Sequence, residues 1–412
     1  MKVYFLLIII QVSTVTAQPI VLNRSIINAK QGERQRLTQR IVSTMQLAYA
    51  DSTFDRFQSA FWAIQYLQYT SPQVLKKVQQ GLAQFITLTN DVQNSLLEVA
   101  YSQYPTQLQL PIQKLIQSPA LTYKQYSVCR QYLYRINPRL IIHIPQPAQL
   151  TSVTSAQLSI DSFVVQDAYS NKYNSTNQRK VLNALLQHKL LANSVVVISL
   201  QNQNRNYPGI VLIKQNDGKY LKQGDTTFYI SQLARAITNL PYNISNGNTP
   251  QGIYRIEGLG VSSNSQIGPT SNLQLCMPYE CAPASFFNST ITDTVWSAAL
   301  YNTLIPPIFT ELQFSFLHQA AIAGQLGRYE IIAHGSTVNT SFYNTNTYKG
   351  YTPTMGCLQA KEVWNYTTGQ RLYSDQQKLV DAYISTGATK GYLVVLNIIN
   401  ANRAVTLYDV LK

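Results

Sequence analysis

The 412-residue sequence has little cysteine, histidine and acidic side chain: four, four and 18 residues respectively. Four cysteines are too few for a disulfide scaffold in a chain of this length, so we expect a hydrophobic core to hold the fold together. Hydrophobic residues make up 45% of the chain, which excludes a largely disordered protein. The length favours two domains, at about 150 residues each.

Long hydrophobic runs are also missing. No segment after residue 17 offers the roughly 18 uninterrupted apolar residues that a membrane-spanning helix needs. Residues 1–17 combine an early lysine, an apolar run from Val3 to Ile10 and small residues ending at Ala17. This pattern predicts a secretory signal peptide cleaved before Gln18. We therefore expect an exported protein with no transmembrane segment after signal cleavage.

Negative charge is scarce, since 18 acidic residues face 32 basic ones and the formal net charge is +14. A basic surface attracts nucleic acid, acidic membranes or acidic polymers. Export and the absence of a Lys/Arg run argue against nucleic acid. A carboxylate-rich wall polymer is the better partner, and a spread of charge that only aids solubility is an equal alternative.

Motifs for metals and nucleotides are absent as well. The sequence has no His-Glu-x-x-His helix, no closely spaced histidines or cysteines with zinc spacing and no Gly-Lys-Ser/Thr phosphate loop. We expect neither a metal nor another cofactor.

The order of patterns along the chain predicts an α+β fold. Apolar residues recur at three and four positions between about 27 and 101, which indicates a helical N-terminal domain over 18–137. Pro, Ser, Thr, Asn and Gln dominate the next stretch, so 138–193 is interpreted as a linker followed by a connecting helix. Short β-branched runs then predict a mostly β domain with covering helices over 194–412.

Within that second domain the strands are expected near 195–198, 210–213, 252–256, 329–333 and 392–398. The covering helices are expected near 230–238, 293–303 and 374–384.

One cysteine lies in a glycine-containing turn, Thr354-Met355-Gly356-Cys357. Glycine lets the backbone approach a substrate and point its N–H groups inward, so the N–H groups of Met355, Gly356 and Cys357 are candidates for an oxyanion hole. Residues 358–364 can begin a helix, and a thiol at a helix N-terminus has a lowered pKa. Residue type alone favours the alternative of a buried structural cysteine.

A histidine supplies the second half of a possible catalytic pair. The strand-like stretch 328–333 leads directly to His334-Gly335-Ser336, where an imidazole is positioned by a turn. Cysteine plus histidine is the minimal activated nucleophile, because the base takes the thiol proton and later returns it to a leaving amine.

Three motifs together resemble the L,D-transpeptidase catalytic domain family (YkuD-like). Residues 249–254, Thr-Pro-Gln-Gly-Ile-Tyr, are similar to its Thr-Pro-x-Gly-x-aromatic signature. In that family a His-Gly turn and then a Gly-Cys turn preceded by Ser or Thr follow, as His334-Gly335 and Thr354-x-Gly356-Cys357 do here. The resemblance spans about 194–399, half of the chain.

This resemblance implies a peptidoglycan L,D-transpeptidase of the periplasm or cell wall. Cys357 would attack the peptide bond after the third residue of a stem peptide, with His334 as base and the carbonyl of Gly335 orienting the histidine. The acyl-enzyme would pass to an amine of a neighbouring stem. Two residues depart from the family pattern: Met355 replaces a second histidine, and Gln359 replaces the Arg or Asn two positions after the cysteine.

Substrate contacts are expected from Arg328, Arg255, Tyr279, Ser336 and Thr354, because stem peptides carry free carboxylates that an arginine binds well. Solvated charge at strand edges is the alternative role for the two arginines. A disulfide between Cys276 and Cys281 is permitted by export, although the short separation leaves it open.

Two further functions stay open at the level of sequence. Water instead of an amine would make the same Cys-His site an L,D-carboxypeptidase or amidase. A catalytically silent wall-binding protein is the other, supported by Met355. The sequence does not assign a role to the helical N-terminal domain.

Overall fold

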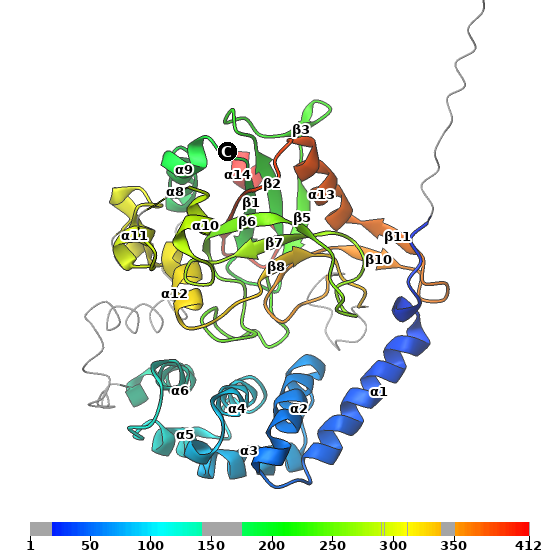
Figure 1. Cartoon of the computed structure of the whole chain (residues 1–412), viewed down its shortest axis with the longest axis vertical. Helices are drawn as coiled ribbons and strands as arrows, with labels where there is room; N and C mark the ends of the chain where they lie inside the picture. Colours follow the sequence, from blue (N-terminus) through cyan, green and yellow to red (C-terminus); the bar gives the residue numbers. More distant parts are fainter. Residues whose placement is uncertain are drawn as a thin grey trace, which may run out of the picture.

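The computed structural model describes residues 19–141, 175–289, 291, 293–310, 312–338 and 351–411. The expected signal peptide over 1–17 and residues 142–174 of the expected linker lie outside this part of the chain. Helices come first and a closed barrel follows, so the expected α+β class is confirmed. Figure 1 shows the helical unit as an arc beside the barrel.

The helical unit is built on one apolar core. Phe57, Phe61 and Ile64 recur on one side of a helix and are fully buried, as the periodicity predicts. Two helices of this unit begin at side-chain caps: the hydroxyl of Ser71 accepts from the N–H of Val74 at 3.2 Å, and that of Thr122 from the N–H of Gln125 at 3.3 Å. The principal helices are α1 (Ile27–Thr44), α2 (Phe54–Leu67), α3 (Pro72–Ala83), α4 (Asn90–Gln103), α5 (Gln109–Leu115) and α6 (Tyr123–Ile136).

The barrel closes in the order β1-β12-β6-β7-β8-β9-β5-β2. Its pairs are antiparallel except β1 with β12 and β8 with β9, which are parallel. The strands are β1 (Val196–Asn202), β2 (Gly209–Lys214), β5 (Ile230–Leu233), β6 (Gly252–Gly260), β7 (Asn272–Cys276), β8 (Ile332–His334), β9 (Leu358–Ala360) and β12 (Gly391–Ile399). Two small ribbons accompany it, β3 (Lys222–Gln223) with β4 (Thr226–Thr227) and β10 (Glu362–Trp364) with β11 (Arg371–Ser374).

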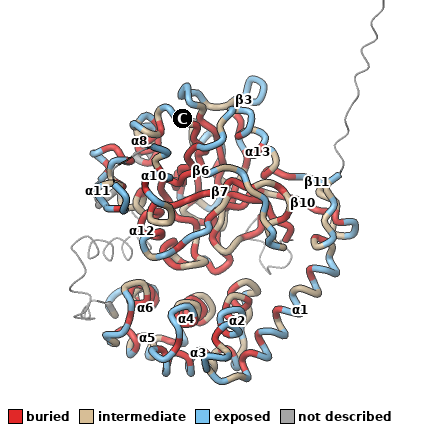
Figure 2. The backbone as a smooth tube through the Cα atoms, in the orientation of Figure 1, coloured by how far each residue is buried: buried red, intermediate tan, exposed pale blue. Residues whose placement is uncertain are grey.

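Both faces of several barrel strands are buried. Alternate residues from all eight strands, such as Val197, Leu358 and Val395, fill one apolar cluster, which is the barrel interior. The residues between them on β1, β2, β6 and β12 pack outward against helices. Figure 2 shows these strands buried along their length, whereas exposed positions recur along the helices. Burial on both faces explains why the strand sequences are continuous apolar runs.

The covering helices lie on the outside of the barrel and at its ends. Ser374 caps α13, accepting from the N–H of Gln377 at 2.9 Å, and the expected helix over 374–384 is confirmed. The expected helix over 293–303 is shorter, because only Ala298–Asn302 is helical. The helices are α8 (Ser175–Leu186), α9 (Lys189–Ala192), α10 (Pro283–Phe287), α11 (Ala298–Asn302), α12 (Gln319–Gln325), α13 (Asp375–Ser385) and α14 (Tyr408–Leu411).

Two predicted helices are wrong. Residues 230–238 contain strand β5, because the chain there pairs with β2 on one side and β9 on the other and so closes the barrel. Residues 358–364 form β9 and β10 instead of a helix, because Leu358 and Ala360 are needed in the barrel interior. In both places pairing with distant strands overrides local preference.

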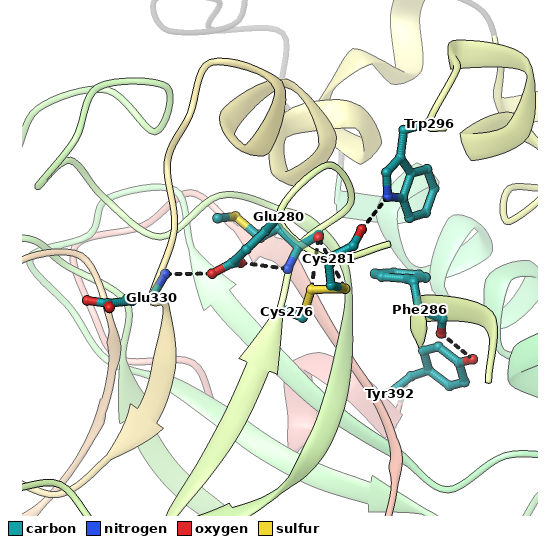
Figure 3. The surroundings of a disulfide bond; sticks show 8 residues. Cys276, Glu280, Cys281, Phe286, Trp296, Glu330 and Tyr392 are labelled. Atoms are coloured by element: carbon teal, nitrogen blue, oxygen red, sulfur yellow. Dashed lines mark hydrogen bonds between the residues drawn. A yellow bond between two sulfur atoms is a disulfide. The ribbon is translucent and has the colours of Figure 1, made fainter. Parts of the chain in front are cut away.

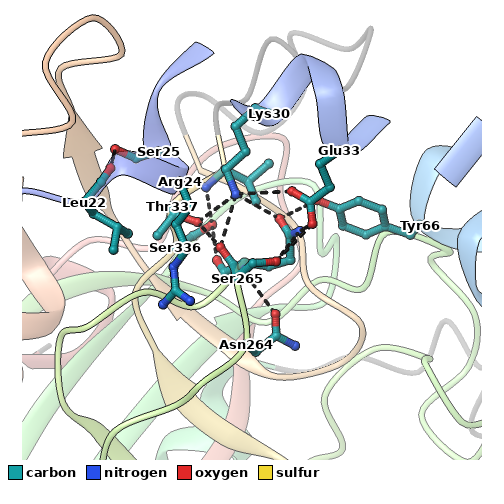
Figure 4. A network of polar contacts seen from close by, with 12 residues as sticks. Leu22, Arg24, Ser25, Lys30, Glu33, Tyr66, Asn264, Ser265, Ser336 and Thr337 are labelled. Carbon is teal, nitrogen blue, oxygen red and sulfur yellow. Dashed lines mark hydrogen bonds and ion pairs between the residues drawn. The ribbon is translucent and has the colours of Figure 1, made fainter. Parts of the chain in front are cut away.

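The helical unit and the barrel share a polar contact that Figure 4 shows. The buried Lys30 on α1 donates to the hydroxyl of Thr337 at 3.0 Å and to the carbonyl of Ser265 at 3.1 Å. Gln266 accepts from the hydroxyl of Tyr66 on α2 at 2.7 Å. Among the described residues, no helix has the length and apolar character needed to cross a membrane.

Candidate functional site

The predicted base lies on β8, and the predicted nucleophile directly precedes the neighbouring strand β9. β8 and β9 run parallel, with Ala333 beside Leu358 and His334 beside Gln359. Ala333 and Leu358 point into the barrel interior, so the alternation of side chains places His334 on the outward face. Cys357 directly precedes β9, and among the described residues no hydrogen bond joins its thiol to the imidazole of His334.

The thiol of Cys357 is half-buried and lies against the backbone of the histidine segment. Its Sγ donates to the carbonyl of Glu330 at 3.5 Å. Burial raises the pKa of the Cys357 thiol, while the N–H of Ile332 and the charge of Arg328 oppose that rise. The expected lowering of the pKa by a helix N-terminus is wrong, because a strand follows the cysteine.

The imidazole of His334 is buried and held by its own turn. Its Nδ1 is hydrogen-bonded to the carbonyl of Gly335, and since a carbonyl only accepts, Nδ1 carries the proton. The lone pair of Nε2 is then the basic one. Burial lowers the pKa of His334 to about 4, so the ring is neutral at pH 7 and able to accept a proton.

The predicted nucleophile turn, residues 354–357, is fixed by Thr354. Its hydroxyl donates to the carbonyl of Cys357 at 2.8 Å and accepts from the N–H of Gly356 at 3.0 Å. Gly356 has a φ of +123°, which only glycine adopts readily. Because the Gly356 N–H already has a partner, the expectation that it contributes to an oxyanion hole is not supported. Met355 and Cys357 remain as backbone donors for that role.

The Thr-Pro-x-Gly segment contacts the nucleophile turn directly. The hydroxyl of Thr249 donates to the carbonyl of Gly356 at 2.9 Å. Gly252 opens β6 with a φ of +132°, and a Cβ there would lie 3.0 Å from the Cβ of Ala320. The hydroxyl of Tyr254 returns to the carbonyl of Pro250 at 2.7 Å. Thr249 and Gly356, 107 positions apart in sequence, thus meet at one place.

The two arginines expected to bind substrate are buried, 4% exposed at Arg328 and 3% at Arg255. Arg328 donates to the carbonyls of Gly247 at 2.6 Å and Asn248 at 2.8 Å, beneath the nucleophile turn. Arg255 packs over the ring of Tyr392 at 4.8 Å. Neither arginine is a solvated charge at a strand edge, and neither is open to bind a substrate carboxylate, because Arg328 is enclosed by backbone carbonyls and Arg255 packs against an aromatic ring.

Two other expected substrate contacts are engaged within the protein. The hydroxyl of Ser336 accepts from the N–H of Val338 at 3.1 Å, and the residue is buried. Tyr279 packs against Trp296, with 5.7 Å between ring centroids. Tyr279 lies in the apolar layer around α10 and α11. Thr354 is half-buried and acts on the backbone of the turn, as described above.

Cys276 and Cys281 form a disulfide, which settles a pairing that the sequence left open. The short loop that it closes presents Glu280, whose carboxylate accepts from the N–H groups of Met277 at 2.9 Å and Glu330 at 2.7 Å. Figure 3 shows Glu280 reaching from the disulfide loop to Glu330. The carbonyl of Glu330 is the group that contacts the Cys357 thiol.

Sequence reasoning missed Glu280 and Glu362. Glu362 accepts from Thr270 at 2.5 Å and from Ser374 at 2.7 Å, and burial raises the pKa of its carboxyl. A Cβ on Gly335 would lie 2.2 Å from that carboxyl, so the turn after the histidine needs glycine. A glutamate between two cysteines was the only available signal for Glu280, and none pointed to Glu362.

Among the described residues, one group of side chains lies close enough together to be considered as metal ligands. Glu257, Cys276 and Cys281 place potential ligand atoms within 4.8 Å of one another. Both sulfurs are bonded to each other, so neither is a thiolate ligand.

Geometrically, then, the candidate site consists of a neutral imidazole on β8 and a thiol at the residue before β9, in a turn braced by Thr249, Thr354 and Arg328. No family model, curated protein or solved structure matches this chain.

Proposed function

We propose that the chain is a peptidoglycan L,D-transpeptidase that transfers an acyl group through a thioester on Cys357. The observation that carries this proposal is the hydrogen bond from the Thr249 hydroxyl to the carbonyl of Gly356, 2.9 Å long. It joins the Thr-Pro-x-Gly segment to the nucleophile turn, next to the strand of His334. This contact supports the proposal because it brings the first of the three motifs against the third, beside the strand that carries the second.

In the proposed reaction the Cys357 sulfur attacks the carbonyl carbon after the third residue of a stem peptide. The thiol proton passes to Nε2 of His334, which returns it to the leaving amine as the C–N bond breaks. An amine of a second stem then attacks the thioester, its proton passes to His334, and the thiol is regenerated. Backbone N–H groups at Met355 and Cys357 are the proposed donors to the oxyanion.

An anionic wall polymer as partner is supported by charge. The chain carries a formal net charge of +14, and a groove of about 570 Å³ between α1 and α2 is lined by Arg36, Arg40 and Arg56 with a single acidic residue, Asp55. The disulfide suits an oxidising compartment such as the periplasm or cell wall. We propose that the helical unit makes peripheral contact with the wall there.

The test is substitution of the nucleophile, with the other free cysteine as matched control. Cys357→Ala is expected to abolish both acylation by a carbapenem and processing of muropeptides, whereas Cys129→Ala, in the helical core, should keep both. Mass spectrometry of products from a tetrapeptide substrate separates the two outcomes: dimers indicate transfer, and shortened monomers indicate a carboxypeptidase or amidase. Full muropeptide processing by Cys357→Ala would refute the proposal.

A catalytically silent wall-binding protein is the second candidate, favoured by two observations. The N–H of Gly356 is already taken by Thr354, and burial raises the pKa of the Cys357 thiol. Wall binding that persists in Cys357→Ala, together with no carbapenem acylation of the unmodified protein, would support this candidate instead.

A further inference from the structure

We infer that Arg328 is a positioning residue whose buried guanidinium stabilises negative charge on the Cys357 sulfur while the thiol reacts. The inference rests on the proposed role of Cys357 as nucleophile. It replaces the helix dipole, which the sequence suggested for this purpose and the strand β9 excludes.

The guanidinium lies directly beneath the nucleophile turn. One of its nitrogens, Nη2, is 2.6 Å from the carbonyl of Gly247 and 3.4 Å from that of Gly356. A Cβ placed on Gly356 would lie 2.2 Å from the same nitrogen, so only glycine allows the arginine to come this close to the residue before Cys357. The other nitrogen, Nη1, donates to the carbonyls of Tyr242 and Asn248.

In the described part of the chain, the hydrogen-bond partners of this arginine are main-chain carbonyls and not carboxylates. Among the described residues no carboxylate lies within ion-pair distance of it. Carbonyl dipoles satisfy the hydrogen bonds of a buried cation without neutralising its charge. A negative charge that forms nearby is therefore stabilised more than it would be in water.

Cys357 is one of few groups placed to supply that negative charge. The groups whose charges act on Arg328 are Tyr254, Cys357, Glu98 on α4 and Glu280 in the disulfide loop. Burial lowers the pKa of Arg328 to about 10, which keeps it charged at pH 7. Around the sulfur itself, Arg328 and the N–H of Ile332 favour the thiolate, whereas Glu330 and Glu280 oppose it.

The experiment measures the pKa of the Cys357 thiol in the full chain, from the pH dependence of alkylation by iodoacetamide followed by peptide mass spectrometry. Arg328→Gln keeps part of the hydrogen bonding and removes the charge, so we expect the thiol pKa to rise by about one unit or more, a tenfold loss of thiolate at a given pH. Arg328→Lys keeps the charge and should shift the thiol pKa by less than about half a unit.

Two internal controls separate charge from folding and from loop geometry. Cys129 is fully buried, so its alkylation reports unfolding of a variant. Thr249→Val removes another donor to the Gly356 carbonyl without changing charge, and it should leave the thiol pKa close to that of the unmodified protein. An unchanged pKa in folded Arg328→Gln, or an equal rise in Thr249→Val or Arg328→Lys, would overturn the inference.

If both Arg328 variants expose Cys129, the unmodified protein decides instead. The nitrogen resonances of the Arg328 guanidinium, followed by NMR, should shift as Cys357 titrates and should not do so in Cys357→Ala. The same response in both proteins would overturn the inference. Failure of the proposed function looks different. A thiol pKa that depends on Arg328, without any carbapenem acylation, would refute the transpeptidase proposal and keep the inference about Arg328. Carbapenem acylation with a thiol pKa that does not depend on Arg328 would refute the inference and keep the transpeptidase proposal.

Discussion

At the scale of single residues, the proposed catalytic pair rests as two neutral groups. Burial raises the pKa of the Cys357 thiol and lowers that of the His334 imidazole to about 4. At pH 7 the thiol therefore keeps its proton and the ring carries only the Nδ1 proton that the Gly335 carbonyl accepts, unlike a preformed thiolate and imidazolium. The proton has to move as the sulfur attacks, which makes His334 a general base in the strict sense.

The neutral His334 ring predicts how the rate of carbapenem acylation changes at acidic pH. Carbapenem acylation should persist below pH 6.5, the ordinary pKa of histidine, and fall only as pH approaches about 4, where His334 becomes protonated. Acylation rates measured between pH 4 and pH 8 check this, with Cys357→Ala as the blank. A midpoint near 6.5 would contradict the buried, neutral ring.

Stability should follow the same titration. The unfolded chain takes up a proton at His334 near pH 6.5 and the folded chain only near 4, so folding stability is lost as pH falls between these values. His334→Gln should lessen this loss in thermal melts, and an identical acid sensitivity in that variant would contradict it.

At the scale of elements, the sequence predicted strands that bury both faces and missed those defined by distant partners. Val196–Asn202 and Gly391–Ile399 are long β-branched runs, and both form as expected. The chain at β5 and β9 is short and locally ambiguous, and its conformation is decided by pairing across the barrel. Periodicity cannot reveal such pairing.

The residues of the candidate site also fall into two groups: those that sequence motifs predict, and those whose surroundings depend on distant parts of the chain. Cys357 and His334 were predicted from the order of short motifs along the chain, and their catalytic roles stay a prediction. Arg328 was assigned to substrate because arginine is usually exposed, whereas here it is enclosed by carbonyls from residues 242 to 248. Glu280 depends on a disulfide whose formation the short spacing left open.

The disulfide loop gives a prediction at this scale. Cys276 and Cys281 are five residues apart, and closing so short a loop stabilises the fold by about 2 kcal/mol in the chain-entropy account. The free energy of unfolding of the double variant Cys276→Ser/Cys281→Ser, measured by denaturant titration, should be lower by that amount. It should also acylate more slowly, since Glu280 would hold Glu330 less firmly beside Cys357.

Glu280→Gln, with the disulfide intact, is the matched control for this loop. It should retain most of the stability that the double variant loses, because the loop stays closed. Equal loss of stability in the two variants would show that the carboxylate contact, and not the closed loop, stabilises this region.

At the scale of the whole molecule, the helical unit and the barrel fold around shared groups. Leu240 and Ile244, from a barrel loop, are buried in the helical core. The same loop continues to Asn246, whose amide donates to the carboxylate of Glu98 on α4 at 3.1 Å, and to Gly247, which accepts from Arg328. The helices therefore brace the loop that supports the nucleophile turn.

Glu98 makes this contact sensitive to pH. Burial raises the pKa of its carboxyl to about 7, from an ordinary value of 4.5. A raised folded pKa means that its contribution to stability is complete below about pH 4.5 and is lost as pH rises through 7. This shift of the Glu98 pKa corresponds to a loss of folding stability on the order of 3 kcal/mol by pH 8.

Glu98→Gln should remove that loss, because the amide oxygen still accepts from Gln65 and Asn246 but never ionises. We expect the variant to melt at a higher temperature than the unmodified protein at pH 8 and at nearly the same temperature at pH 5. Asp55→Asn, an exposed carboxylate in the same helical unit, is the matched control and should leave the pH dependence unchanged. If Glu98→Gln instead destabilises the protein equally at both pH values, the carboxylate is ionised in the folded state and binds the barrel loop as a charge. The contact between the helical unit and the barrel would then depend on an ionised group and not on a neutral hydrogen-bond network.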